Sequence, residues 1–483
     1  MSPDPAKALV IVANRLPIEI GNDGTATPSP GGLASALSAV AAEHCTWVGW
    51  SGATSNRRVP ATLGGTQLYP VALTKAEADR YYLGFSNSVL WPLFHGRLRR
   101  EEMNRSWWRA YRAINERFAV AVSLTAPTDA TVWVHDYHLL LVPRLLRARR
   151  PDLRIGLFMH IPFPNAQLFS MLPWRQEVMS GMLGADLIGF QVADDVSNFL
   201  TTADRVLQVS VDGNRIKHWT RSVEVATFPI SVDFAHWDEL GAASVDEASA
   251  HRAEVATPYI LLGIDRLDYT KGITQRLGAF EELLLDGQFD PNECTFVQFA
   301  VPSRSDLPAY QDERDDVETI VGRINARHRR ADGSGPVHLV LTTLDDVGLA
   351  AWYRATDVMV VTSLADGMNL VAKEFVAARG DNGGVVVLSE FAGAAQDLGG
   401  ALIVNPYDIE AIKRSLVMAK KMPLAERTAR MMNMRDSVRD HDVHQWAQSF
   451  LDRLNASPRV GARASIRSVV TRVRRRVAAR LGA

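Results

Sequence analysis

Cysteine and long apolar runs are scarce in this sequence. Cys45 and Cys294 are its only cysteines, and two isolated thiols form neither a disulfide framework nor the paired spacing of a zinc or iron–sulfur site. No apolar run approaches the roughly 18 residues that a membrane-spanning helix needs, and the polar first residues differ from a signal peptide. We therefore expect a protein of the reducing cytoplasm that is neither secreted nor inserted in a membrane.

The chain as a whole also lacks an excess of charge of one sign. It has 53 Lys and Arg residues against 54 Asp and Glu residues, so no strong overall field attracts nucleic acid or an anionic membrane. Any phosphate chemistry must then depend on local clusters. The tail at 458–483 is an exception, because it has eight arginines and no acidic residue. We expect a solvated basic helix there rather than a membrane or partner anchor.

The length and the hydrophobic pattern predict two α/β domains. A chain of 483 residues with 47% hydrophobic content is too long for one compact core. Short β-branched runs alternate with stretches of helical spacing, which is typical of α/β layers. We expect two Rossmann-like doubly wound domains with an active-site cleft between them. The runs expected to form buried parallel strands are 9–13, 131–135, 154–159, 187–190, 259–264, 295–299, 358–361 and 385–388.

The domain junction is predicted where this alternation pauses. Ala, Ser, Glu and Asp dominate 233–258, and Pro258 precedes a new apolar run. The expected division is therefore a domain at 1–235, a second at 236–435, a helix at 436–457 that can cross back to the first domain, and the basic tail at 458–483.

A small-residue loop follows the first predicted strand. Ligands bind at the carboxyl ends of strands in open α/β sheets. Asn14 and Arg15 come directly after the strand, and Gly31-Gly32 then opens a helix whose N-terminal amides can bind an anion. A Gly pair at this place is more often only a turn. The loop is not the Gly-x-Gly-x-x-Gly fingerprint, which argues against a nucleotide-dependent dehydrogenase.

Two cations lie five positions apart after the strand at 259–264. Arg266 and Lys271 lie on a turn that enters a helix. Arg offers a planar fork for two phosphate oxygens and Lys a movable point charge, so together they suit a departing diphosphate without a metal. The alternative is that they form a surface salt bridge with Asp265 or Asp268.

Two carboxylates lie eight positions apart after the strand at 358–361. Asp366 stands before a Gly turn, where it can accept sugar hydroxyls, and Glu374 lies inside the following helix, where it can accept two ribose hydroxyls. The amides near Leu370, at the start of that helix, would face a phosphate. A carboxylate pair alone is weak evidence.

Histidines and aromatic residues complete the candidate set. His135-Asp136-Tyr137-His138 and His160 follow strands, but they lack a second histidine at i, i+4 and a nearby cysteine, so we expect no metal. We expect hydrogen bonds to sugar hydroxyls instead, with packing as the alternative for His138. The stretch 81–92 has aromatics too dense and irregular for an amphipathic helix. Such faces suit a sugar, although aromatic clusters are more often core.

With these motifs the sequence resembles the trehalose-6-phosphate synthase family, which are retaining glycosyltransferases (family 20) with the two-Rossmann GT-B fold. The resemblance runs from about Leu9 to about Trp446. The motifs that carry it occur in order at 14–15, 31–33, 47–52, 85–92, 133–140, 160–164, 266–272, 302–306, 366–374, 390–395 and 404–407.

The resemblance implies three overlapping sets of site residues. It implies catalytic roles for Asp136, His160, Arg266, Lys271 and Asp366. The implied donor site consists of Gly31, Gly32, Arg266, Lys271, Asp366, Met368, Asn369, Leu370, Val371 and Glu374. The implied acceptor site, for glucose 6-phosphate, consists of Arg15, Trp50 (or Trp47), Tyr82, Trp91, Asp136 and Arg304.

The resemblance implies the first step of trehalose biosynthesis. Glucose would pass from a nucleotide-diphosphate glucose to glucose 6-phosphate, giving α,α-trehalose 6-phosphate. UDP-glucose is favoured as donor, and ADP- and GDP-glucose remain open. The resemblance further implies a homo-oligomer, a dimer or a tetramer. We expect no cofactor, because the nucleotide sugar is a co-substrate, no nucleic-acid partner, and a separate phosphatase for the product.

The resemblance implies transfer with retention, and we therefore expect displacement on one face of the donor sugar. No carboxylate stands out as a covalent nucleophile, unlike the paired carboxylates of retaining glycosidases. The departing diphosphate would itself accept the proton of the acceptor hydroxyl. Two alternatives remain: a related glucosyltransferase that makes glucosylglycerol phosphate, and a sugar-phosphate sensor without turnover.

Overall fold

A computed structural model describes residues 8–20, 26–28, 32–40, 45–54, 62–97, 103–218 and 221–457 of the chain. The described residues form two compact units. Unit 1 takes in the chain up to Phe94, then Leu98–Phe228, and the chain from Gln448 onward. Unit 2 takes in His95–Arg97 and Pro229–Ala447. The basic tail at 458–483 lies outside the described residues.

Unit 1 is built on one large, mainly parallel sheet. Its strand order is β10-β11-β12-β9-β8-β7-β1-β4-β6-β5, and the order along the chain reverses between β1 and β7. The seven neighbouring strands β6, β4, β1, β7, β8, β9 and β12 pair in parallel. Antiparallel hairpins add β5 at one edge of the sheet and β10 and β11 at the other. The strands are β1 (Leu9–Arg15), β4 (Thr46–Trp50), β5 (Thr62–Leu63), β6 (Thr66–Pro70), β7 (Thr131–His135), β8 (Arg154–Phe158), β9 (Leu187–Phe190), β10 (Ser210–Asp212), β11 (Arg215–His218) and β12 (Arg221–Thr227), with β2 (Ile18–Ile20) and β3 (Ala26–Pro28) as a separate antiparallel pair.

Most of the aromatic stretch at 81–92 forms a π-helix in unit 1, and its last two residues begin α3. In η2 (Asp79–Leu90) the side chains of Asn87 and Ser88 each donate to a carbonyl five residues back, at 2.8 Å in both cases. A π-helix has a wider turn than an α-helix, which explains why the aromatics do not follow α-helical spacing. The other helices of unit 1 are α1 (Gly32–Val40), α2 (Lys75–Ala78), α3 (Trp91–Phe94), α4 (Arg105–Thr125), η3 (Tyr137–Leu139), α5 (Val142–Arg149), α6 (Ala166–Phe169), α7 (Arg175–Met182) and α8 (Ala193–Leu207).

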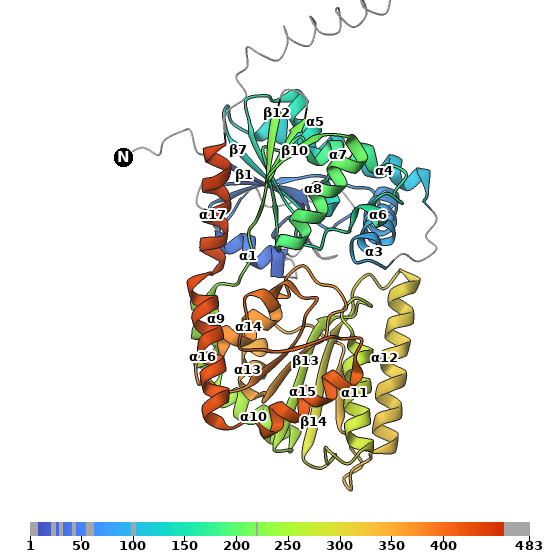
Figure 1. The fold of residues 1–483 in the computed structure, drawn as a ribbon, viewed down its shortest axis with the longest axis vertical. Helices are drawn as coiled ribbons and strands as arrows, with labels where there is room; N and C mark the ends of the chain where they lie inside the picture. The colour runs from blue at the N-terminus through green and yellow to red at the C-terminus, as the bar shows by residue number, and fades with distance from the viewer. Residues whose placement is uncertain are drawn as a thin grey trace, which may run out of the picture. The chain divides into compact units, whose positions relative to one another are not determined.

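Unit 2 is built on a parallel sheet with the strand order β15-β14-β13-β16-β17-β18. Counted along the chain, this is the 3-2-1-4-5-6 order of the Rossmann fold, and it reverses between β13 and β16. Figure 1 shows β13 and β14 between α13 and α12. The strands are β13 (Tyr259–Arg266), β14 (Cys294–Val301), β15 (Val337–Val340), β16 (Val358–Val361), β17 (Val385–Ser389) and β18 (Leu402–Val404).

Two helices occupy the stretch 233–258, where the sequence pattern pauses. They are α9 (Phe234–Ala243) and α10 (Val245–Val255), and both belong to unit 2. Gly241 of α9 lies against α14, where an added Cβ would stand 2.1 Å from the Ala378 carbonyl oxygen. The remaining helices are α11 (Ile273–Leu285), α12 (Pro308–Arg327), α13 (Asp346–Ala355), α14 (Leu370–Ala378), η4 (Gly393–Gln396), α15 (Ile409–Lys421), α16 (Leu424–Asp440) and α17 (Val443–Ala456).

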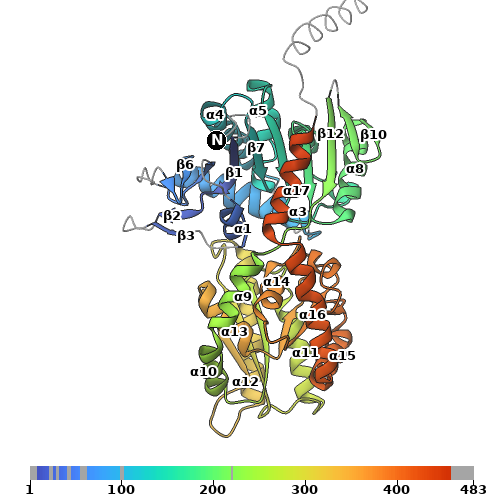
Figure 2. The ribbon, with the colours of Figure 1, turned by 90° about the vertical axis from the view of Figure 1, so that its left-hand side faces the viewer.

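From Gln448 onward α17 packs on the sheet of unit 1. The buried Phe450 ring stacks on Trp133 with the ring centres 4.8 Å apart. A Cβ added at Gly156 of β8 or Gly189 of β9 would lie 2.7 or 2.8 Å from the Phe450 ring, so the helix rests directly on these strands. Figure 2 shows α17 running beside the strands of unit 1.

The predicted α/β architecture is confirmed, and so are the eight predicted parallel strands. All eight predicted runs form β-strands with parallel neighbours. Within the described residues, no helix combines the length and the apolarity that crossing a membrane requires.

Candidate active site

An arginine lies on two aromatic rings at the carboxyl edge of the unit 1 sheet. Strands β1 and β4 pair in parallel with Arg15 opposite Trp50, so both side chains leave the sheet at the same edge. The Arg15 guanidinium carbon lies 4.3 Å from the centre of the Trp50 ring and 5.6 Å from that of Tyr82 on η2. Glu19 pairs with Arg15 at 3.1 Å. This group holds a partly exposed cation between aromatic faces, which suits a phosphate attached to a sugar.

The neighbouring aromatic residues of unit 1 are buried and mainly stabilise the surrounding structure. Trp47 donates its indole N–H to the Arg15 carbonyl at 3.0 Å and is buried, whereas Trp50 contacts the guanidinium itself. Trp91 is buried and packs on Tyr137. His138 is buried too, with its ring 5.7 Å from Tyr82, so it packs among the aromatics.

Asp136 and His160 meet where β7 and β8 end. The Asp136 amide donates to the Phe158 carbonyl at 2.7 Å, and an Asp136 carboxylate oxygen accepts the His160 amide at 3.2 Å. Asp136 has φ of 71°, a left-handed conformation that is uncommon outside glycine and concentrates at functional sites. Burial lowers the pKa of His160 to about 3, so its imidazole is neutral at neutral pH.

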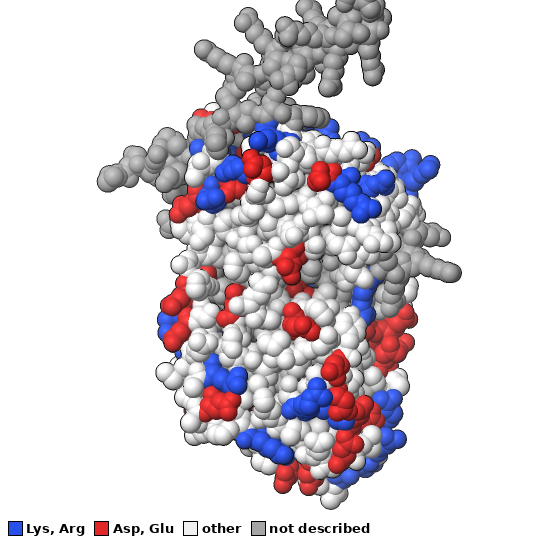
Figure 3. Space-filling model, viewed as in Figure 1, with Lys and Arg blue, Asp and Glu red and all other residues white. Residues whose placement is uncertain are grey.

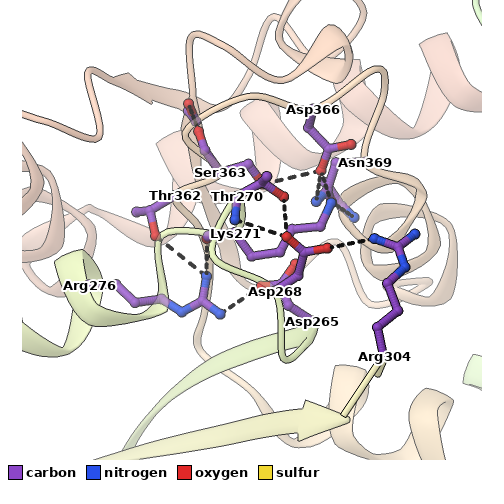
Figure 4. A network of polar contacts seen from close by, with 12 residues as sticks. Asp265, Asp268, Thr270, Lys271, Arg276, Arg304, Thr362, Ser363, Asp366 and Asn369 are labelled. Carbon is purple, nitrogen blue, oxygen red and sulfur yellow. Dashed lines mark hydrogen bonds and ion pairs between the residues drawn. The ribbon is translucent and has the colours of Figure 1, made fainter. Parts of the chain in front are cut away.

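Lys271 and Asp366 form an ion pair at the reversal point of the unit 2 sheet. Their side chains follow the adjacent strands β13 and β16, and Lys271 Nζ lies 2.6 Å from Asp366 Oδ2. Ser363 and Asn369 donate to the same oxygen at 3.2 and 3.1 Å (Figure 4). Burial opposes ionisation of Asp366, but the attraction of Lys271 holds the pKa of its carboxyl below the usual range. The site therefore contains a cation paired with a charged acceptor.

The start of α14 lies beside this ion pair. Asn369 caps the helix by accepting the Ala372 amide at 3.1 Å, and it adopts φ of 77°. The amides at 370 and 371 belong to the same first turn, where the helix dipole favours an anion. Met368 is held by its carbonyl, which accepts the Ala394 amide at 2.8 Å.

The turn that contains Lys271 is held by buried acidic side chains. Asp268 Oδ1 accepts both the amide and the hydroxyl of Thr270, at 3.0 and 2.9 Å. Its Oδ2 accepts Arg304 at 3.4 Å and the Tyr310 hydroxyl at 3.2 Å. Figure 4 shows Arg304 pointing at Asp268 from the side opposite Arg276. Asp268 therefore joins the turn to a second cation.

Asp265 and Asp268, the predicted alternative salt-bridge partners of Arg266 and Lys271, each pair with another cation. Asp265 pairs with the buried Arg276 at 2.6 Å, and Asp268 pairs with Arg304. The interpretation of Lys271 as a salt bridge to Asp265 or Asp268 is therefore wrong, because its ion pair is made with Asp366. Arg266 ends β13 with an exposed side chain.

Glu374 lies one turn inside α14. Its carboxylate accepts the Tyr353 hydroxyl of α13 at 2.8 Å. Burial raises the pKa of Glu374 to about 7, while the hydrogen bond from Tyr353 acts in the opposite direction. The carboxyl is thus oriented by a neighbouring helix and can accept vicinal hydroxyls when ionised.

The structure gathers the predicted residues into two groups. Unit 1 contains Arg15, Trp50, Tyr82, Trp91, Asp136 and His160, and unit 2 contains Arg266, Lys271, Arg304, Asp366, Met368, Asn369, Leu370, Val371 and Glu374. Gly32 is the first residue of α1, and Gly31 lies outside the described residues.

Sequence reasoning missed the residues that orient these groups. Tyr310 and Tyr353 lie on helices far along the chain from their partners, and no local pattern signals them. Glu19 pairs with Arg15 across the turn from β1 to β2, where a spacing of four residues carries no signal of the kind it has on a helix. Among the described residues, no three His, Cys, Asp or Glu side chains gather as a metal-binding group.

Comparisons with known proteins define the class to which these two groups belong. The sequence profile of Glycosyltransferase family 20 matches residues 7–456. A trehalose-6-phosphate synthase from Mycolicibacterium gilvum (strain PYR-GCK) is 44% identical in an alignment of 477 residues that covers 94% of this chain and 95% of that protein. The chain therefore belongs to glycosyltransferase family 20, and it is an enzyme that transfers a glycosyl group.

Solved structures agree with this assignment. An alpha,alpha-trehalose-phosphate synthase (UDP-forming) from Burkholderia xenovorans, in complex with glucose-6-phosphate, has a TM-score of 0.86 and 37% identity, covering 93% of this chain and 100% of that one. An E. coli structure described as trehalose-6-phosphate bound with UDP-2-fluoro glucose has a TM-score of 0.85 and 35% identity, covering 93% and 99%. The two α/β units are thus those of the GT-B fold.

Proposed function

We propose that this enzyme transfers glucose from UDP-glucose to glucose 6-phosphate with retention, giving α,α-trehalose 6-phosphate and UDP. The observation that carries the proposal is the arrangement at the reversal point of each sheet. In unit 1 a cation on aromatic faces adjoins the hydrogen-bonding pair Asp136 and His160. In unit 2 a cation and a carboxylate adjoin a helix N-terminus. The first arrangement suits a sugar phosphate and the second a nucleotide sugar.

The donor is assigned to unit 2. Arg266 and Lys271 neutralise the diphosphate together with the first amides of α14. Lys271 turns from Asp366 toward the diphosphate, and Asp366 then accepts hydroxyls of the glucose. Glu374, held by Tyr353, accepts the ribose hydroxyls.

The acceptor is assigned to the unit 1 group. Arg15 binds the phosphate, Trp50 and Tyr82 cover the sugar ring, and Asp136 accepts a hydroxyl. The family resemblance also implies Arg304 for this phosphate, and within unit 2 Asp268 and Tyr310 orient its guanidinium.

The reaction step needs no covalent enzyme intermediate. The bond between the glucose anomeric carbon and the diphosphate oxygen breaks, and the anomeric hydroxyl oxygen of the acceptor bonds to that carbon on the same face. The hydroxyl proton passes to a diphosphate oxygen, so UDP leaves with the bond electrons. Lys271, Arg266 and the helix amides stabilise the negative charge that develops on the diphosphate.

The ligands described for two related solved structures support the proposed substrates. The Burkholderia xenovorans structure is described as UDP-forming and contains glucose-6-phosphate, and the E. coli structure contains a UDP-glucose analogue. We further propose that the enzyme works in the cytoplasm as a homo-oligomer without a resident cofactor or metal, and that a separate phosphatase removes the phosphate of the product.

A product assay tests the proposed function. The protein is incubated with UDP-, ADP- or GDP-glucose and with glucose 6-phosphate or glycerol 3-phosphate, in EDTA, and released nucleotide and new glycosides are measured by mass spectrometry. We expect UDP and a disaccharide phosphate only when UDP-glucose and glucose 6-phosphate are both present. Product from glycerol 3-phosphate alone, or no product with any donor, would contradict the proposal.

A substitution links the activity to unit 2. Lys271→Ala removes the cation that faces the leaving diphosphate, so kcat should fall about 100-fold or more while the KM for glucose 6-phosphate changes little. An unchanged kcat would remove Lys271 from the mechanism.

A further inference from the structure

A second histidine lies behind His160, and the proposed mechanism does not use it. His135 is the last residue of β7, and its backbone pairs with Phe158 of the parallel strand β8. Its Nδ1 lies 3.1 Å from Nε2 of His160. His135 is fully buried, and its ring lies against Trp133, with the ring centres 4.6 Å apart. The imidazole thus has one fixed polar neighbour.

Both imidazoles are neutral in this setting. Burial lowers the pKa of His135 well below its ordinary value, with His160 adding to the effect, and burial also lowers the pKa of His160. Two neutral rings share one proton in their common hydrogen bond. Either His135 Nδ1–H donates to His160, or His160 Nε2–H donates to His135. The choice decides which nitrogen of His160 carries the proton.

The surroundings of His135 Nε2 indicate which of the two histidines donates the shared hydrogen bond. Within the part of the chain that the structure describes, His135 Nε2 is buried and has no hydrogen-bond partner. If His160 donated, His135 would have to carry its proton on this nitrogen, leaving a buried N–H without an acceptor. If His135 donates, the nitrogen is an unpaired acceptor, and native structures tolerate this more often than an orphaned N–H.

We propose that His135 is a positioning residue that holds His160 as the Nδ1–H tautomer. His135 Nδ1–H donates to His160 Nε2, and the proton of His160 then resides on Nδ1. This inference deepens the proposed function and rests on the placement of His160 among the residues that contact the sugars. His160 presents an N–H donor there, and the adjacent Asp136 presents a carboxylate acceptor.

The backbone keeps this pair in register. The Asp136 carboxylate accepts the His160 amide at 3.2 Å, and the Asp136 amide donates to the Phe158 carbonyl at 2.7 Å. The two histidines therefore come from backbone segments that are hydrogen-bonded to each other. A donor and an acceptor held side by side match a hydroxyl group, which both accepts and donates.

The tautomer is measured directly by NMR. The protein is labelled with 15N-histidine, long-range 1H–15N correlations report which ring nitrogen is protonated, and His160→Asn assigns the His160 signals. We expect His160 to be protonated at Nδ1 and bare at Nε2. Protonation at Nε2 in the wild-type protein would overturn the proposal. The readout does not depend on which substrates the enzyme uses.

Two variants test the positioning role. His135→Phe removes the donor, so the His160 spectrum should shift toward the Nε2–H form and kcat should fall at least roughly tenfold, with a smaller change in the KM for glucose 6-phosphate. His135→Asn keeps an N–H donor near the Nδ1 position and should recover part of kcat. A wild-type kcat in a folded His135→Phe variant contradicts the role, and so does equal kcat in the two variants.

The outcomes distinguish this inference from the proposed function. An active wild-type enzyme with His160 protonated at Nε2 rejects the tautomer and leaves the glucosyl transfer standing. A wild-type protein without glucosyl transfer rejects the proposed function, while the spectrum still reports the tautomer.

Discussion

At the scale of residues, Gly52 determines where the Arg15 guanidinium can lie. Gly52 adopts φ of +84°, and an added Cβ would stand 2.1 Å from Arg15 Nη1. Gly52→Ala should therefore push the guanidinium off the Trp50 face. We expect the KM for glucose 6-phosphate to rise about tenfold or more, equivalent to ~1.4 kcal/mol, with little change in the KM for the donor. Steady-state kinetics with each substrate varied in turn measures this effect.

Gly64→Ala is the matched control. Gly64 also belongs to unit 1 and adopts φ of +52°, but nothing lies within 4 Å of an added Cβ. It carries a similar backbone penalty without the contact to Arg15. Equal rises in the acceptor KM for both variants would show that backbone strain, and not Arg15, is responsible.

The ion pairs show what residue-level reasoning can reach. The motif at 265–272 predicts that cations and carboxylates meet, but pairing by proximity in sequence favours the wrong partners for Lys271. Its true partner, Asp366, lies 95 positions away in the sequence and is adjacent only because β16 neighbours β13. Sequence spacing therefore identifies candidate side chains, but the order of the strands in the sheet determines which of them form pairs.

At the scale of elements, the turn between β13 and α11 depends on Gly272. Gly272 precedes α11 with φ of +61°, and an added Cβ would lie 2.0 Å from the Thr362 carbonyl oxygen. Gly272→Ala must displace the chain after β16, which contains Asp366. We expect a loss of ~1–3 kcal/mol in the free energy of unfolding beyond the backbone penalty, together with reduced kcat. Urea denaturation measures the loss of stability.

Gly287→Ala separates the contact from the backbone penalty. Gly287 also belongs to unit 2 and has φ of +68°, with nothing within 4 Å of an added Cβ. Gly287→Ala should lower the free energy of unfolding by only about 1–2 kcal/mol, the penalty of the left-handed conformation. If Gly272→Ala were no more destabilising than Gly287→Ala, the close approach to Thr362 would not matter.

Elements differ in how clearly the sequence encodes them. The eight predicted strands are buried on both faces and form short, mostly apolar runs, which is why they are recognisable. The edge strands β5 and β10 are short and exposed, so they lack such a run. The π-helix η2 follows neither the α-helical nor the β-strand period, and the sequence therefore predicted an aromatic cluster without its conformation.

At the scale of the whole molecule, Phe450 attaches α17 to the sheet of unit 1. The ring is fully buried against Trp133 and both sheet glycines, so Phe450→Ala would leave a cavity. We expect the free energy of unfolding of unit 1 to fall by ~3–5 kcal/mol. Leu124→Ala on α4 removes a side chain that is 73% exposed and should change stability by less than ~0.5 kcal/mol. Similar urea midpoints for the two variants would contradict the packing role of α17.

The organisation of the whole chain is partly visible in its sequence. The charge balance predicts a surface without one dominant sign, and Figure 3 shows acidic and basic side chains interspersed over the face in view. The sequence places the domain junction at 235–236, whereas the units divide at Phe228–Pro229. The difference arises because α9 packs on α14 of unit 2, a contact that composition does not signal.

The stereochemistry of the product tests the central claim most directly. The proposed transfer with retention joins two anomeric carbons, so the 1H NMR spectrum of the purified product should show two α-anomeric protons with small couplings, no reducing end, and a 31P signal from a phosphate on carbon 6. A large anomeric coupling from a β-linked glucose, or a free reducing end, would contradict the account.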